Sequence, residues 1–184
     1  MNVTRRNKYA RRQGIRWQQG LVLLIILVVI VSSGIWRGND QSHAPEDLSE
    51  GTYQVRRVID GDTLLLENGA RVRLICANTP ETVKPDHPVE PFGPEATRFT
   101  KDFLAGGNAY LTFDREKVDR YDRFLAYVWQ DERMELMLNE ELIREGLAQA
   151  KTGYRFSAQM KKRFSRAEDE AKAEKRGIWS GGNP

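Results

Sequence analysis

Short apolar segments joined by tight-turn signals constrain the fold of this chain more than any other feature. Residues 53–59, 63–66 and 71–76 are three such segments, and Asp60-Gly61 and Asn68-Gly69 lie between them. Asp-Gly and Asn-Gly pairs are frequent corners of β-hairpins. Because a tight turn fixes the register of the strands it joins, these residues predict a three-stranded antiparallel meander.

The sequence after the meander predicts a proline-rich surface loop over 80–94, two further strands and three helices. The strands are expected over 109–113 and 124–129. The helices are expected over 95–104 after Pro94, over 138–144 up to Gly146, and from an N-cap at Ser157 to about 175 before Gly177. A helix between the third and fourth of five strands is the order of an OB-type barrel. The sequence therefore predicts an α+β domain over 52–180, in which about three helices pack on a five-stranded OB-fold barrel.

The N-terminal part has the pattern of a membrane anchor. Residues 1–19 are basic, and residues 20–36 are apolar and uncharged, with Trp17 and Trp36 on either side. This length is close to the ~20 residues that a membrane-spanning helix needs, and basic residues favour the cytoplasmic side. We therefore expect a single-pass transmembrane helix with a cytoplasmic N-terminus, a flexible linker over 37–51 and an extracytoplasmic domain. The alternative is a cleaved signal peptide and a secreted domain.

The charge of the chain does not predict a basic nucleic-acid-binding face. Of the 29 lysines and arginines, six lie in residues 1–20, which contain no acid, so the other 23 face 26 acidic residues. Any nucleic-acid site must then be a local patch. Cys76 is the sole cysteine, which excludes an intrachain disulfide and suggests a buried thiol, and His43 and His87 are too isolated for a zinc site of the usual kind.

Oxygen-bearing and cationic side chains follow the expected strand ends. Asp60, Asp62, Arg73, Asn78 and Glu81 supply carboxylates, an amide oxygen and a guanidinium. A metal-dependent phosphodiesterase needs this chemistry: hard oxygens for a divalent cation, a base for water and a planar cation for phosphate. Taken singly, each motif has a simpler interpretation, because Asp-Gly suits a hairpin corner and a proline stiffens a strand end.

Together, these motifs resemble those of the thermonuclease (staphylococcal nuclease-like) family over about residues 53–179. The matching segments are Val58-Ile59-Asp60-Gly61-Asp62-Thr63, Thr79-Pro80-Glu81-Thr82, Phe92-Gly93-Pro94-Glu95-Ala96, Tyr121 with Arg123 and Leu125-Ala126-Tyr127, Asn139-Glu140, Gly146-Leu147-Ala148 and Gly177-Ile178-Trp179. The resemblance implies an OB barrel with helices, calcium dependence, and hydrolysis of DNA and RNA to products that end in 3′-phosphate.

The resemblance also implies a role for each site residue. The metal-binding positions fall on Asp62, Asn78 and the carbonyl of Thr79, and the general base falls on Glu81. The remaining positions are the phosphate-binding arginines, Arg73 and Arg123, and the nucleotide contacts, Arg120, Tyr121 and Tyr154. Single-stranded DNA or RNA is the expected partner, and no obligate protein partner is expected.

Two residues depart from the family pattern. Asn78 stands where aspartate is usual, and loss of that charge is expected to weaken calcium binding. Asp122 stands where glycine is usual, and it could pair with Arg123 or point to solvent. Two alternatives to a nuclease therefore stay open: an OB module that binds single strands without catalysis, and a tethered scaffold that binds protein through its charged last helix.

The anchor hypothesis predicts that residues 1–36 stay on the mature protein. The apolar segment is uncharged, and no clean small-x-small cleavage site follows its core. Intact-mass measurement on a membrane extract is expected to give the full-length chain. A soluble species that lacks the apolar segment would contradict the anchor and support secretion.

Overall fold

The computed structural model describes residues 45–82 and 88–181, all of which belong to one unit, His43–Pro184. The expected basic tail, transmembrane helix and most of the linker lie outside the described residues. Within the described residues, no helix is long and apolar enough to cross a membrane. The centre of the expected loop, residues 83–87, also lies outside them.

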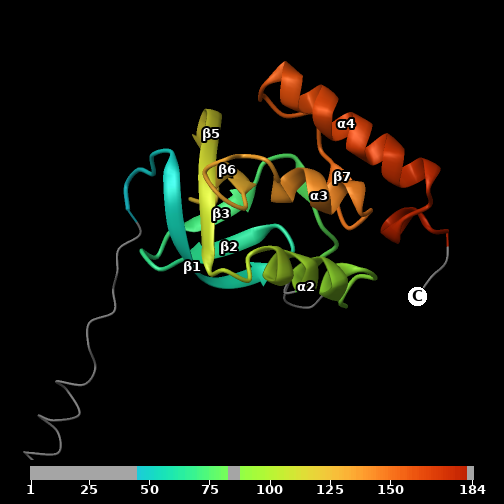
Figure 1. The fold of residues 1–184 in the computed structure, drawn as a ribbon, viewed down its shortest axis with the longest axis horizontal. Helices are drawn as coiled ribbons and strands as arrows, with labels where there is room; N and C mark the ends of the chain where they lie inside the picture. The colour runs from blue at the N-terminus through green and yellow to red at the C-terminus, as the bar shows by residue number, and fades with distance from the viewer. Residues whose placement is uncertain (1–44, 83–87, 182–184) are drawn as a thin grey trace, which may run out of the picture. The chain divides into compact units, whose positions relative to one another are not determined.

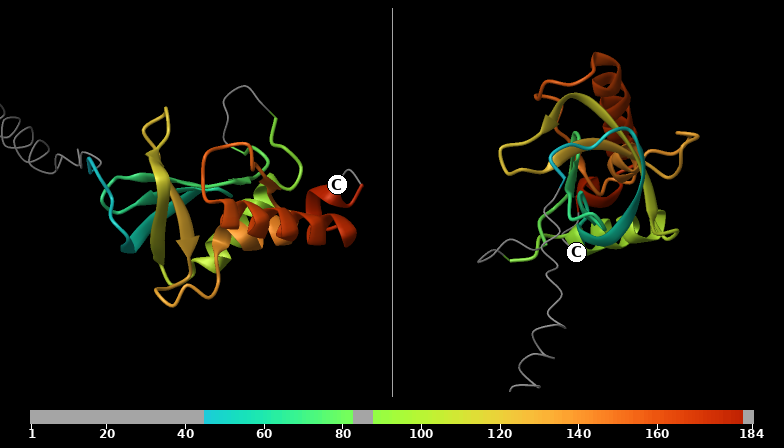
Figure 2. Two further views of the ribbon diagram at one scale, coloured as in Figure 1. Left: turned by 90° about the horizontal axis from the view of Figure 1, so that it is seen from above. Right: turned by 90° about the vertical axis from the view of Figure 1, so that its left-hand side faces the viewer.

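Five strands close into the barrel that the sequence predicts (Figures 1 and 2). They follow one another around it in the order β1-β2-β3-β6-β5, and β3 and β6 are the parallel pair. Their bounds are β1 Gly51–Asp60, β2 Thr63–Leu66, β3 Arg71–Leu74, β5 Asn108–Val118 and β6 Phe124–Trp129. Apolar side chains that alternate along the strands are buried, among them Leu64, Leu66, Val72 and Leu111.

Three helices lie on one side of the barrel (Figures 1 and 2). They are α2 Gly93–Phe103, α3 Leu138–Arg144 and α4 Ala158–Ala173, followed by the short η1 Gly177–Trp179. Ser157 occupies the N-cap position of α4, as predicted, but its side chain makes no capping hydrogen bond. Helix α4 ends earlier than predicted, because Lys175 adopts the left-handed conformation that closes it and Gly177 lies beyond that turn.

The segment after β3 departs most from the sequence prediction. The expected strand over 71–76 ends at Leu74, because Cys76 has a φ of 68°, which breaks the extended conformation. A two-residue strand, β4 Ala77–Asn78, follows and pairs with β7 Gln149–Ala150. Buried Asn139 at the start of α3 fixes the bend, since its amide nitrogen donates to the Ile75 carbonyl at 2.9 Å. The bend redirects the chain out of the barrel.

The first hairpin corner lies one residue later than predicted. Asp60 pairs with Thr63, so Gly61 and Asp62 form the turn between β1 and β2. Gly61 is not in the left-handed region, and close packing explains why a glycine stands there. Buried Thr100 of α2 donates its hydroxyl to the Gly61 carbonyl at 2.6 Å, which ties the turn to the helix.

Substitution of Gly61 by alanine is expected to destabilise the domain by about 1–3 kcal/mol, as overpacking does. The added β-carbon would lie 2.7 Å from Ala96 Cβ and 2.7 Å from Thr79 Cγ2. Thermal unfolding measures the effect, and Gly153→Ala is the control, because no atom lies within 4 Å of the β-carbon it would add. Equal stability of the two variants would show that the turn tolerates a side chain.

Candidate functional site

Two cavities that share Arg73, Asn78 and Arg123 contain all nine residues singled out by the sequence. The smaller, of about 210 Å³, is lined by all six predicted metal-binding and catalytic residues, together with Asp60 and Pro80. The larger, of about 430 Å³, is lined by the predicted nucleotide-binding residues Arg120, Tyr121 and Tyr154. The fold therefore brings together side chains that are up to 92 positions apart in the chain, from Asp62 to Tyr154.

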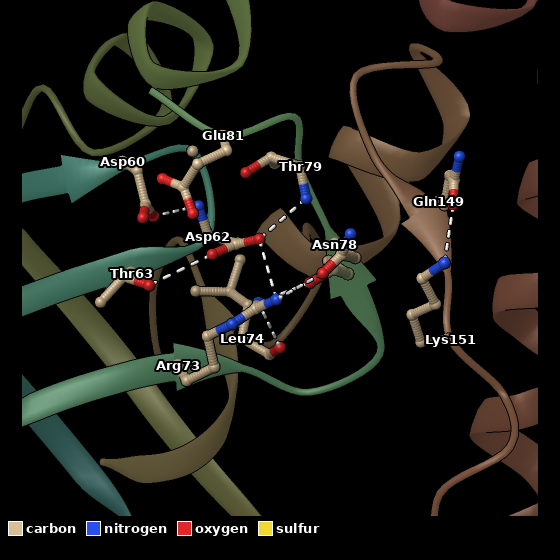
Figure 3. A network of polar contacts seen from close by, with 12 residues as sticks. Asp60, Asp62, Thr63, Arg73, Leu74, Asn78, Thr79, Glu81, Gln149 and Lys151 are labelled. Atoms are coloured by element: carbon tan, nitrogen blue, oxygen red, sulfur yellow. Dashed lines mark hydrogen bonds and ion pairs between the residues drawn. The ribbon is translucent and has the colours of Figure 1, made fainter. Parts of the chain in front are cut away.

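Asp62 is the buried centre of the smaller cavity, with 5% of its surface exposed. Its Oδ2 accepts a hydrogen bond from the Thr79 backbone N–H at 2.8 Å and lies 3.0 Å from Arg73 Nη2. Its Oδ1 accepts a hydrogen bond from the Thr63 hydroxyl at 3.1 Å. Figure 3 shows these contacts, which fix the carboxylate between the turn after β1 and the chain after β4.

Asp60, one of the carboxylates at the expected strand ends, also lines the smaller cavity. Its Oδ1 accepts a hydrogen bond from the Asp62 backbone N–H at 3.1 Å. Burial, followed by the negative charge of Asp62, raises the pKa of Asp60 to about 6. A carboxylate held near a second one in this way attracts a cation, which relieves the repulsion between them.

Arg73 extends from β3 and contacts the residues on both sides of the bend at 75–76. Its guanidinium donates to the carbonyls of Leu74 at 3.1 Å and Ala77 at 2.5 Å, and Nη2 donates to Asn78 Oδ1 at 3.1 Å. With the Asp62 ion pair, these bonds hold the planar cation in one orientation. The amide oxygen of Asn78 therefore faces the same guanidinium as the Asp62 carboxylate (Figure 3).

Glu81 lies where the proline-rich loop leaves the site. The Glu90 backbone N–H donates to the Glu81 carbonyl at 2.9 Å, and the Glu81 N–H donates to Glu90 Oε2 at 2.9 Å. Glu81 Oε1 accepts a hydrogen bond from the Thr82 N–H at 3.0 Å. These bonds close the base of the loop and place the Glu81 carboxylate at the wall of the smaller cavity.

Arg123 forms an ion pair with Asp119, a residue that the sequence analysis did not single out. Its Nε donates to Asp119 Oδ2 at 2.8 Å, and its Nη2 lies 2.7 Å from the same oxygen. Partial burial alone would raise the pKa of Asp119, but hydrogen bonds from Arg123 and from the Tyr121 N–H lower it. Asp122 is exposed, with a φ of 57°, so the solvent-facing alternative for this residue is the observed one.

Exposed aromatic rings and arginines form the rim of the larger cavity. Tyr121 is 54% exposed and Tyr154 is 71% exposed. Arg120 lies over the Tyr121 ring, with its guanidinium carbon 4.8 Å from the centroid, and donates to the Tyr121 hydroxyl at 2.7 Å. Exposed rings beside cations are the features with which proteins stack nucleobases and contact phosphates.

The oxygen donors of the smaller cavity fit a hard cation such as calcium. Asp62, Asp60, Glu81, the Asn78 amide and the Thr79 carbonyl are oxygen donors, and calcium accepts such mixed ligands in irregular geometry. Over residues 45–82 and 88–181, no three His, Cys, Asp or Glu side chains converge closely enough to form a metal site by themselves. A calcium ion here would therefore depend on amide, backbone and water oxygens as well as carboxylates.

Comparison with known proteins identifies relatives over most of the chain. Residues 71–181 match the family model described as staphylococcal nuclease homologue. The chain is 39% identical over 170 residues to a thermonuclease of Staphylococcus hyicus, covering 88% of this chain and 96% of the relative. It is 40% identical over 162 residues to a thermonuclease of Staphylococcus intermedius, covering 86% and 94%. Endonuclease YncB of Bacillus subtilis is 38% identical over 128 residues, covering 67% and 59%.

Proposed function

The chain belongs to the staphylococcal nuclease homologue family, and we propose that it is a membrane-anchored, calcium-dependent nuclease. The relatives named thermonuclease and endonuclease support a phosphodiesterase. The proposed reaction is hydrolysis of phosphodiester bonds in DNA and RNA that leaves 3′-phosphate ends. The proposed location is the extracytoplasmic side of the membrane, with residues 20–36 as the anchor.

The observation that carries this proposal is the composition of one small cavity. Six residues predicted from separate motifs line it, and they combine buried and half-buried oxygen donors with two guanidinium groups. Hydrolysis of a phosphodiester needs both kinds of group. The guanidinium groups offset the negative charge of the phosphate oxygens, and a carboxylate accepts a proton from the attacking water.

Each residue of the cavity has a distinct proposed role. A calcium ion held by Asp62, Asn78 and the Thr79 carbonyl would polarise a phosphoryl oxygen. Glu81 would accept the proton of the attacking water. Arg73 and Arg123 would bind the non-bridging oxygens, because their planar guanidinium groups match the geometry of phosphate.

Single-stranded nucleic acid is the proposed substrate. Tyr121 and Tyr154 expose their rings beside the smaller cavity, where unpaired bases could stack on them. Arg120 adds a positive charge next to Tyr121. These contacts would hold the nucleotides next to the scissile bond without reading their sequence.

Substitution of Glu81 by glutamine is expected to lower kcat by about 10²–10⁴-fold, the usual contribution of a general base. The test measures cleavage of single-stranded DNA by the full-length protein with calcium, and excess chelator is expected to abolish wild-type activity. Glu95→Gln is the matched control, because Glu95 is an exposed glutamate of α2 that lines neither cavity. Full activity of Glu81→Gln would exclude Glu81 as the base.

Substitution of Asn78 by aspartate is expected to lower the calcium concentration for half-maximal activity by about an order of magnitude. A carboxylate there adds a contact worth about 4 kcal/mol per unit of cation charge at ~4 Å and an effective dielectric of ~20, before the double charge of calcium is counted. Arg73 and desolvation offset a large part of it. Gln149→Glu adds the same charge to the residue paired with Asn78 across β4 and β7, yet Gln149 does not line the smaller cavity. Equal shifts in both variants would place Asn78 outside the calcium shell.

A binding module without catalysis is the second candidate, and one observation favours it. Both proposed phosphate-binding arginines form ion pairs within the domain, Arg73 with Asp62 and Arg123 with Asp119. If these pairs persist with substrate, the chain binds single strands but does not turn them over. The scaffold hypothesis has less support, because Arg163 and Glu170 of α4 form ion pairs with Glu140 and Arg144 of α3.

A further inference from the structure

The larger cavity has a second cationic wall that the roles described so far do not use. Lys151 and Arg155 lie on the segment between β7 and α4, far along the chain from the turn that carries Arg120 and Arg123. Both are exposed, and Tyr154 stands between them in sequence. The cavity is thus lined by cations and an exposed tyrosine from each of two segments.

The fold fixes the position of Lys151 relative to the smaller cavity. Strand β7 pairs with β4, so that Gln149 lies opposite Asn78, and the Lys151 N–H donates to the Cys76 carbonyl at 2.8 Å. Lys151 Nζ donates to Gln149 Oε1 at 2.7 Å, as Figure 3 shows. The ammonium group is therefore held beside the strand that carries Asn78 by a hydrogen bond to a neutral amide.

In the larger cavity, two of the carboxylates have bonding partners within the domain, whereas several of the cations do not have a carboxylate partner in the described residues. Asp119 binds Arg123, and Asp114 Oδ2 accepts hydrogen bonds from the Tyr127 hydroxyl and the Ser157 N–H, at 2.7 and 2.8 Å. In the described part of the chain, by contrast, Arg120, Lys151 and Arg155 form no ion pair with a carboxylate. Five cations face three carboxylates around this cavity, of which the third, Glu116, is exposed. The excess positive charge suits a polyanion.

We propose that Lys151 and Arg155 form a phosphate subsite that binds a backbone phosphate next to the scissile one. The assignment rests on the proposed nuclease function for the identity of the ligand, a single-stranded nucleic acid. The shared residues Arg73 and Arg123 hold the scissile phosphate, the tyrosines receive bases, and the second wall binds the next phosphate along the strand. This subsite strengthens the binding of strands long enough to reach it over that of shorter ones, and it takes no part in the chemical step.

The test compares a ligand that reaches the subsite with one that does not. The double variant Lys151→Gln/Arg155→Gln of the full-length protein is measured against fluorescent octathymidylate and against dithymidylate, which has one phosphodiester, in excess chelator to prevent cleavage. Binding of the octamer is expected to weaken about tenfold at low salt. The slope of the logarithm of the binding constant against the logarithm of the salt concentration is expected to become shallower by about 0.7 for each phosphate that the variant leaves unneutralised. Binding of dithymidylate is expected to stay within about twofold.

A control variant separates the subsite from general charge. Arg98→Gln/Lys101→Gln removes the same charge from exposed positions of α2, outside both cavities, and is expected to leave both affinities unchanged. Equal weakening for the two ligands, equal weakening by the control variant, or no change for the octamer would each overturn the subsite.

Turnover distinguishes this inference from the nuclease proposal. With calcium, the double variant is expected to raise KM for octathymidylate while kcat stays unchanged. If the wild-type protein fails to cleave but the difference in octamer binding persists, the nuclease proposal fails and the subsite stands.

Discussion

The rest of the site depends on the hydrogen bonds and the ion pair of the Asp62 carboxylate. Asp62 joins the turn after β1, through its own backbone, to the chain after β4, through the Thr79 N–H, and to β3, through Arg73. A carboxylate at 5% exposure is costly to leave ionised unless such partners compensate for its lost hydration. The same bonds that stabilise the charge therefore also aim two oxygen donors and a guanidinium at one cavity, which couples the stability of this corner to its chemistry.

The barrel and the three helices could be predicted because their signals are local, whereas the nine lining residues came from the resemblance of short motifs to those of a known family. Strand alternation, Asn68-Gly69 and the apolar faces of the helices act within a few residues. The bend over 75–76 could not be found in this way, since it depends on Asn139, which is 64 residues from Ile75 in sequence. The role of Asp119 was missed for a related reason: an acid four residues before an arginine in a turn is usually solvated, and only the fold shows that Arg123 bends back onto it.

Glycine at position 61 illustrates a motif with two interpretations. Asp-Gly is a favourable hairpin corner because glycine tolerates positive φ. Here the corner residues are Gly61 and Asp62, and Gly61 is required by the close approach of Thr79 and Ala96 instead. The Asp-Gly motif thus predicted a hairpin that is present, although close packing, and not a positive φ, explains why the glycine is needed. The same packing connects Gly61 to the site, since Thr79 also lines the smaller cavity.

The geometry around Arg73 suggests why asparagine can stand at position 78. The guanidinium already has one carboxylate partner in Asp62 and two backbone carbonyls, so a neutral amide completes its hydrogen bonds without a second charge. An aspartate there would add negative charge beside Asp60, Asp62 and Glu81, which a bound cation would offset. Asparagine therefore lowers the electrostatic repulsion of the metal-free site, and under the calcium proposal it also weakens the binding of that ion. Since extracellular calcium sites function at affinities of about 10⁻⁴–10⁻³ M, weaker binding is compatible with the proposed location outside the cytoplasm.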